Sequence, residues 1–237
     1  MKTTLIIMKK ELKSFLLSPL AYVIGVVILV FFGIFFTGIS IESGYPELGP
    51  TFQNFTFILI FAIPLITMRL VAEEKKRGTI ELLMTLPARA QNVIMGKFLA
   101  VTIVYVMILG VTLIHTLVLA LLGSPAFWPI FTGYLGVILM GMALLSLGLF
   151  ISTLTESQVV AGLSSLGLGL FLLLIRILSR SASGKAADVI KELSFFDHLN
   201  PFLTGLIDLK HVAFFAIFIA LGLVLSINYM ENEKWRK

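Results

Sequence analysis

Long uncharged, apolar stretches alternate with short polar ones along most of this 237-residue chain. A helix of about 20 residues crosses the hydrocarbon core of a bilayer, and in hydrocarbon every backbone polar group must be paired within such a helix. The pattern predicts six membrane-spanning helices near residues 20–41, 52–70, 98–122, 129–153, 157–177 and 212–230. We therefore expect an all-α integral membrane protein, with residues 1–237 forming one transmembrane domain.

The third and fourth spans come from one continuous stretch, residues 98–155, which contains no Asp, Glu, Lys or Arg. That stretch is too long for a single crossing. Gly123, Ser124 and Pro125 are typical turn residues, so they are expected to divide it into two helices.

Residues 1–18 follow a different pattern, because apolar residues recur there at helical spacing and lysines fill much of the remainder. Lys9 and Lys10 stand beside Glu11 in this segment. We expect an amphipathic helix that lies in the headgroup plane with its lysines toward anionic lipid. Ser18 and Pro19 should end it and turn the chain into the bilayer. The alternative is a simple basic flank of the first span.

The stretch from residue 68 to 98 is the long polar interruption in the first two-thirds of the chain. A charged side chain at the bilayer centre costs about 2.5–3.5 kcal/mol, so this stretch must lie in water between the second and third spans. Nine of its residues are charged: Arg69, Glu73, Glu74, Lys75, Lys76, Arg77, Glu81, Arg89 and Lys97.

Within that stretch, the coupling region at residues 71–97, a short helix is expected after residue 78. The hydroxyl of Thr79 can accept a hydrogen bond from a backbone N–H at its start. Ile80, Leu83 and Met84 then share one face, and Pro87 ends the helix. A short surface helix between two spans is suited to being moved by a soluble partner.

The positions of Lys and Arg predict the orientation. Thirteen of the 18 lie in the N-terminal segment, the central stretch and the C-terminus, and five lie in the other loops. The positive-inside rule therefore places both termini and the central stretch in the cytoplasm. Residues 178–211 are then external. They contain two short apolar pieces, 187–196 and 202–209, which we expect to form interfacial or re-entrant helices because each is too short to span.

The composition supports a membrane protein. Only 13% of the residues are charged, 58% are hydrophobic and the mean hydropathy is +1.04, whereas soluble domains carry about 25% charged residues. The chain has no cysteine, which excludes thiol chemistry, disulfides and cysteine-ligated metals.

Motifs for catalysis or nucleotide binding are missing. Gly96-Lys97 has Gln91 where a phosphate-binding loop needs glycine, and no Ser or Thr follows it. The three histidines, His115, His198 and His211, are scattered, so packing or polar contact is favoured over a metal site. We expect this chain to bind no cofactor or metal itself.

The spans carry few polar features. Acidic residues are missing from their interiors, which argues against an ion-coupled secondary transporter. Arg176 stands at a span end, where snorkelling to the interface would explain it. Ala161, Ser165 and Gly169 recur every four residues and form a small-residue stripe that allows close helix packing, inside one subunit or across a dimer.

The central stretch carries a recognisable order of motifs. Ala72-Glu73-Glu74 is followed by Arg77-Gly78-Thr79-Ile80-Glu81-Leu82-Leu83, by Thr85-Leu86-Pro87 and by Gly96-Lys97. With these motifs the chain, over nearly its whole length, resembles ABC-2-type permeases, the membrane subunits of ATP-binding-cassette transporters. Lys10-Glu11-Leu12 with Ser18-Pro19 resembles the N-terminal amphipathic helix of that family. Residues 197–209 resemble its branch associated with bacterial gliding motility and nitrous-oxide-reductase maturation.

The resemblance implies a non-catalytic permease in the bacterial inner membrane. Two permease subunits, identical or related, would pair above two cytoplasmic ATPase subunits that bind ATP and Mg²⁺. A companion membrane protein with a large external domain is expected in the gliding-type branch, and no nucleic acid is. The implied ATPase-coupling residues are Glu73, Glu74, Arg77, Gly78, Thr79, Ile80, Glu81, Leu82, Leu83 and Pro87.

The substrate stays open between polysaccharide, lipid, peptide and force passed to an external machine. The main alternative is a non-transporting membrane scaffold that transmits ATPase motion to an external partner. A secondary transporter is the third possibility.

Overall fold

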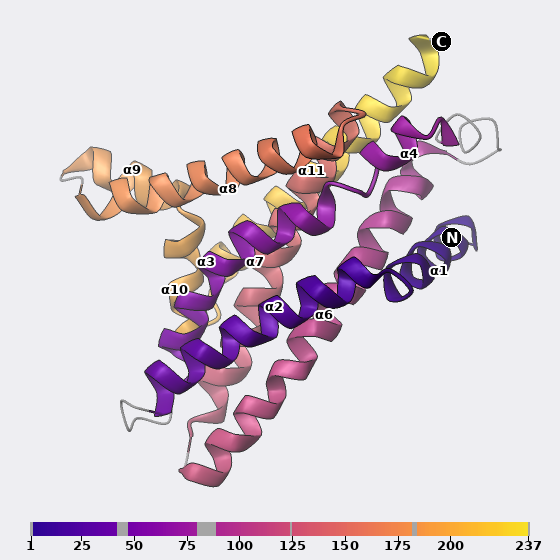
Figure 1. Ribbon diagram of the computed structural model, residues 1–237. Coiled ribbons are helices and arrows are strands. Elements are labelled where there is room, and N and C mark those ends of the chain that lie inside the picture. The colour runs from indigo at the N-terminus through magenta and orange to yellow at the C-terminus, as the bar shows by residue number, and fades with distance from the viewer. Residues whose placement is uncertain (1, 42–46, 80–88, 124, 182–183, 237) are drawn as a thin grey trace.

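The structure is a computed structural model that describes residues 2–41, 47–79, 89–123, 125–181 and 184–236. The described residues form helices joined by short turns, and no strand occurs among them (Figure 1). The elements are α1 (Lys2–Leu16), α2 (Pro19–Phe35) with a π-helical continuation η1 (Phe36–Ile41), α3 (Gly49–Thr67), α4 (Ala72–Lys76), α6 (Ala90–Leu122), α7 (Phe127–Leu154), α8 (Gln158–Ser181), α9 (Lys185–Leu193), α10 (Phe195–Leu203) and α11 (Leu209–Arg236).

Six helical segments of the described chain are long and apolar enough to cross a membrane. They are Pro19–Ile41, Gly49–Lys76, Ala90–Leu122, Phe127–Leu154, Gln158–Ser181 and Leu209–Glu233. The all-α prediction with six spans is therefore confirmed. In the segments that contain α3 and α7, 67% of the residues in the 18-residue apolar stretch are buried, against 22–28% in the other four segments. α3 and α7 therefore form the centre of the bundle.

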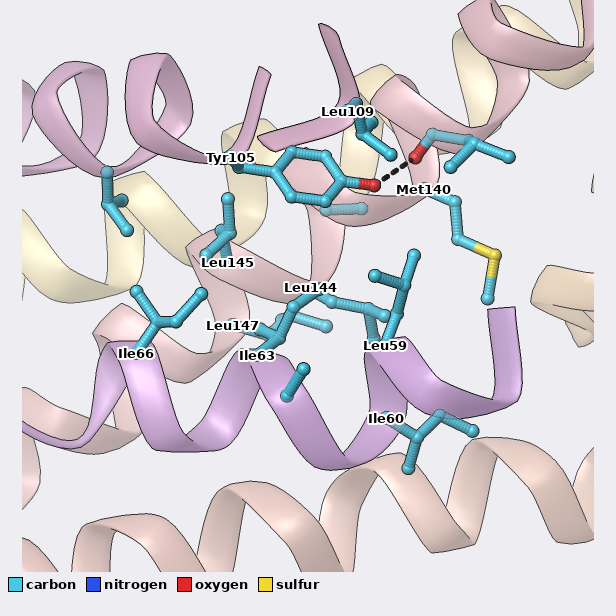
Figure 2. Close-up of a cluster of buried hydrophobic side chains, with 14 of the residues drawn as sticks. Leu59, Ile60, Ile63, Ile66, Tyr105, Leu109, Met140, Leu144, Leu145 and Leu147 are labelled. Atoms are coloured by element: carbon cyan, nitrogen blue, oxygen red, sulfur yellow. Dashed lines mark hydrogen bonds between the residues drawn. The ribbon is translucent and has the colours of Figure 1, made fainter. Parts of the chain in front are cut away.

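Close helix contacts hold this centre together. Tyr105 of α6 lies against Gly141 of α7, where a Cβ atom would be 2.3 Å from the tyrosine hydroxyl, and that hydroxyl donates to the backbone oxygen of Val137 at 2.8 Å. Figure 2 shows the tyrosine beside the apolar side chains of α3 and α7. Because hydrocarbon offers no hydrophobic drive between helices, such close packing and hydrogen bonds supply the association.

Both termini lie at the same end of the bundle as α4, whereas α9 lies far from them (Figure 1). At the terminal end α1 packs across the start of α6. Gly96 permits this approach, because a Cβ there would be 2.8 Å from the Ile7 side chain and 3.1 Å from the backbone oxygen of Thr4.

The segment between the last two spans differs from its expected division. The chain breaks at Ser194, whose hydroxyl accepts a hydrogen bond from the N–H of Asp197 and so starts α10. α10 then continues through Asn200 and Pro201 to Leu203. The second apolar piece, predicted at residues 202–209, does not form a helix of its own: residues 202–203 end α10, residues 204–208 are turn or irregular, and Leu209 starts α11. The phenylalanines of α10 are buried: Phe195 packs against α11, Phe196 against α3 and α8, and Phe202 against α7.

Candidate functional site

The short helix α4 begins under a serine supplied by another helix. The backbone N–H groups of Val71 and Ala72 both donate to the hydroxyl of Ser152 on α7, each at 3.1 Å. The first N–H groups of a helix have no partner inside the helix, so this hydroxyl takes the place of a capping side chain. The start of α4 is thereby fixed to the central helix α7.

One side of α4 is joined to α1 and α6 through a buried lysine. Lys97 of α6 is 1% exposed, and its Nζ lies 2.9 Å from Oε2 of Glu74 and 3.2 Å from Oε1 of Glu11. The Nζ of Lys10 lies 3.7 Å from Oε1 of Glu11 and 3.8 Å from Oε1 of Glu74. We call these four residues the Lys97 cluster. Lys97 is the buried charge of this cluster, and the two carboxylates beside it compensate for its removal from water, whereas the Lys10 side chain is 62% exposed.

The other side of α4 is joined to the last helix. The Lys75 ammonium pairs with the carboxylate of Glu233 on α11 and lies 5.0 Å from the ring centre of Tyr229. The Lys75 side chain is almost fully buried, so it is held by this ion pair and ring rather than by water. Neighbouring residues of α4 thus bind opposite ends of the chain.

α4 ends at a glycine that has a left-handed backbone. Gly78 has φ +70°, and its N–H donates to the backbone oxygen of Lys75. Residues with a Cβ rarely adopt this conformation, so glycine suits the end of the helix. Thr79 follows, and its hydroxyl donates to the backbone oxygen of Glu74 at 3.3 Å. Arg77 is exposed and pairs with Glu73 one turn back.

The predicted coupling helix itself lies outside the described residues. This applies to Ile80, Glu81, Leu82, Leu83 and Pro87. The structure describes the two anchors of that segment, α4 on one side and the start of α6 on the other.

The remaining predicted residues are distributed over two regions. In the N-terminal region Lys9 is exposed, while Pro19 occupies the first turn of α2. Ala161, Ser165 and Gly169 are buried on α8. A Cβ at position 169 would be 2.6 Å from the side chain of Ile60, so the stripe allows α8 to approach α3 within the subunit.

The sequence predicts that Arg176 extends its side chain to the membrane–water interface, and the structure shows that it does not. It is 5% exposed, and its guanidinium lies over the rings of Phe57 and Phe196, at 4.7 and 4.5 Å from their centres. The helix α10 folds back over the end of α8 and covers it. The same contact places the hydroxyl of Ser179 2.7 Å from Asp197, to which it donates.

The fold brings two of the three histidines together, although the sequence indicates that all three are scattered. The Nδ1 atoms of His198 and His211 lie 2.7 Å apart, so they share one hydrogen. His198 also stacks on Phe214, and its Nε2 lies 3.1 Å from the backbone oxygen of Glu192. Nothing in the sequence pairs these histidines, because one belongs to α10 and the other to α11.

Burial lowers the pKa of the His198 imidazole below its ordinary value, and the nearby His211 lowers it further, against an opposing effect of the hydrogen bond to Glu192. The described part of the chain contains no group of three or more His, Cys, Asp or Glu side chains placed to hold a metal ion. His115 lies apart from this pair and packs against Phe32 and Phe36.

A family model described as "ABC-2 family transporter protein" matches residues 5–230 of the chain. The match covers the first five spans, the sixth span up to residue 230, the Lys97 cluster and residues 80–88. It gives no support to the narrower branch associated with gliding motility and nitrous-oxide-reductase maturation. No curated protein matches the chain significantly.

Proposed function

The chain belongs to the ABC-2 family of transporter proteins, and from that premise we propose that a separate cytoplasmic ATPase drives it as a permease subunit. Family membership makes the chain a membrane subunit of a transporter. The observation that carries the proposal further is the attachment of α4 to four other helices. α4 contacts α7 through Ser152, α1 and α6 through the Lys97 cluster, and α11 through Lys75.

Those attachments determine which helices would move if a partner displaced residues 80–88. The segment 80–88 runs from the end of α4 to the start of α6, so a partner that moves it acts on both helices. Tightly packed elements move as units rather than deforming continuously. In our proposal the ATPase binds this segment, and ATP-driven closure of the ATPase shifts α4 and α6 together.

Helix α3 connects α4 to the opposite end of the bundle, so it could carry a displacement of α4 to that end. It ends just before α4, and near its start Gln53 donates to the side chain of Asn200 on α10 at 3.1 Å. Phe57, one turn further along, supports the guanidinium of Arg176 beside α10. A displacement of α4 would therefore reach α10 along one continuous helix in the centre of the bundle.

The proposed assembly contains two permease subunits above an ATPase dimer. ATP and Mg²⁺ would bind to the ATPase, and the termini and α4 would face the cytoplasm of a bacterial inner-membrane protein. The excess of Lys and Arg at this end supports that orientation.

The test is affinity purification of the tagged protein from its own membranes in mild detergent, followed by mass spectrometry. An ATP-binding-cassette ATPase should be recovered at near-equal amount. Leu82→Glu and Leu83→Glu should abolish its recovery, because a charge on an apolar residue of the proposed coupling helix would have to be desolvated on docking. Leu206→Glu, at an exposed leucine of the opposite end, is the matched control and should retain the ATPase.

Two outcomes would overturn the proposal. Normal ATPase recovery with both charged variants would place the contact elsewhere. If the wild-type protein is monodisperse but no ATPase is purified with it, the next hypothesis to test is transport driven by an ion gradient without ATP. A protein with a large external domain in the same complex would instead favour the gliding-type branch.

A further inference from the structure

A charged hollow of about 450 Å³ lies beside the Lys97 cluster. Its size falls within the range of about 300–1,000 Å³ that is usual for small-molecule sites. The walls come from α1, the turn after α3, α4 and the start of α6. Its charged lining includes Lys10, Glu11, Arg69, Glu74, Arg77 and Lys97.

The charges of this hollow do not balance. Glu73 also lines it, which gives four basic side chains against three carboxylates. Arg77 pairs with Glu73, and both lysines belong to the Lys97 cluster. Arg69 pairs with no carboxylate among the described residues, and its buried Nε has no hydrogen-bond partner there. An unsatisfied buried donor is costly, so Arg69 favours an anion in the hollow.

Two apolar cavities lie between the charged hollow and the outer surface of the bundle, and neighbouring cavities share lining residues. Phe15, Ser18 and Arg69 line both the hollow and a small apolar cavity next to it. Phe15 also lines a groove of about 240 Å³ between α2 and α6. The Phe15 side chain therefore stands between the charged hollow and this α2–α6 groove and borders both.

The α2–α6 groove opens on the side of two membrane-spanning helices. Tyr22 and Val26 of α2 and Met107 and Val111 of α6 are exposed along it. Gly25 contributes to its depth, because the nearest atoms to a Cβ there would be 3.8 Å away on Ile108. With α2 and α6 spanning a bilayer, this open groove would be accessible to lipid chains, and the hollow lies beside the charged residues of α1 and α4.

We propose that the charged hollow and the α2–α6 groove together bind one anionic lipid. Its phosphate would pair with Arg69, whose planar guanidinium suits two-pronged contact with phosphate oxygens. One acyl chain would lie in the groove. An acyl chain gains little binding free energy by exchanging one apolar neighbour for another. The headgroup contact therefore determines the affinity, and the groove determines where the acyl chain lies. The site requires the membrane-spanning placement of α2 and α6 and does not depend on the ATPase.

The test uses the purified full-length protein in nanodiscs of phosphatidylcholine with a minor fraction of phosphatidylglycerol. Native mass spectrometry then counts the lipids released with the protein. The wild type should retain one phosphatidylglycerol per subunit in preference to phosphatidylcholine. Arg69→Gln should reduce that preference about tenfold, the size expected for one charge-assisted contact, and Arg69→Lys should restore part of it.

The groove is tested independently of the headgroup. Gly25→Leu should fill it and lower phosphatidylglycerol retention while Arg69 is intact. Gly110→Leu is the matched control on α6, because a Cβ at position 110 meets nothing within 4 Å, and it should retain the lipid. All variants should elute as monodisperse proteins and unfold at similar temperatures.

Three results would overturn the proposal. Equal retention of both lipids by the wild type removes the anion preference. Full competition by soluble glycerol phosphate shows a headgroup site without a lipid occupant. A disulfide between two copies carrying Val26→Cys shows that a second copy of the chain, rather than a lipid, covers the groove.

Discussion

The ammonium group of Lys97 lies 2.9 Å from the carboxylate of Glu74, although the two residues belong to helices on either side of the central segment. This contact joins α4 and α6 to each other, and these two helices flank residues 80–88 in the sequence. A partner bound to the segment would therefore move α4 and α6 as one body.

Removing the lysine of this pair should destabilise the protein. Lys97→Met leaves Glu74 and Glu11 without their nearest cation in a largely buried site, at a cost of about 3 kcal/mol. Thermal unfolding in detergent should show a lower midpoint than for the wild type. The double variant Lys97→Met with Glu74→Gln should recover part of the loss. Lys76→Met, at an exposed position of α4, is the control, and an equal effect from it would refute the role of the buried pair.

A side chain at position 96 should displace α1. Gly96→Val places atoms within about 3 Å of Ile7 and the backbone of Thr4, a spacing that real contacts do not show. Hydrogen exchange should report faster exchange of the amides of residues 2–16. Gly110→Val on the same helix adds the same side chain in open space. Unchanged protection of α1 in Gly96→Val would contradict the observed packing.

The orientation of the chain is accessible to single cysteines, because the sequence contains none. Lys76 and Leu206 are both exposed and lie at α4 and after α10. A membrane-impermeant maleimide added to intact cells should label Leu206→Cys and spare Lys76→Cys. Permeabilised cells should give labelling of both. The opposite pattern in intact cells would reverse the predicted topology.

Arg176 should not tolerate lysine. A guanidinium stacks flat on aromatic rings, whereas an ammonium is a compact charge that holds water more strongly. Arg176→Lys should therefore weaken the contact of α8 with Phe57 and Phe196 by about 1–2 kcal/mol. Faster hydrogen exchange in α10 would reveal the loss. Arg180→Lys, at an exposed position of the same helix, should leave α10 unchanged.

The histidine pair should make the packing of α10 sensitive to acid. Burial and the charge of His211 lower the pKa of His198 below 6.5, while the Glu192 carbonyl opposes them and Lys210 adds a weaker lowering. As pH falls below 6.5 the open state binds a proton before the packed state does, so stability present at neutral pH is lost. Proteolysis of residues 185–209 at pH 7.5 and 5.5 should show this loss. His198→Gln should remove the pH dependence, and an unchanged dependence would assign it to another group.

Much of the architecture could be predicted because the bilayer restricts what a chain can do. An uncharged run of about 20 residues has one stable form in hydrocarbon, so six such runs predict six helices. α6 ends at Leu122 and α7 begins at Phe127, and Gly123 and Pro125 lie between them because glycine is a poor helix former and proline cannot donate the backbone hydrogen bond that would continue the helix. Local sequence was sufficient for these features.

The contacts of the site depend on how distant helices meet, which local sequence does not specify. Lys97 and Glu74 each look like solvated charges until α1 covers them. Arg176 looks free to reach the interface until α10 folds over it. His198 and His211 look unrelated until α10 packs against α11. In each case a neighbour from elsewhere in the chain changes the environment of a side chain whose type was plain from the start.

The pairing of Lys75 with Glu233 also has a consequence for how the protein is made. Lys75 emerges from the ribosome well before Glu233, the carboxylate it meets among the described residues, because the two are separated by 158 positions in the chain. Until the final helix is threaded into the membrane, the lysine has to remain hydrated or associate with something else. The α4 end of the bundle is therefore completed only after α11 has been synthesised and inserted, and a chain cut short before Glu233 would carry an uncompensated charge at that end.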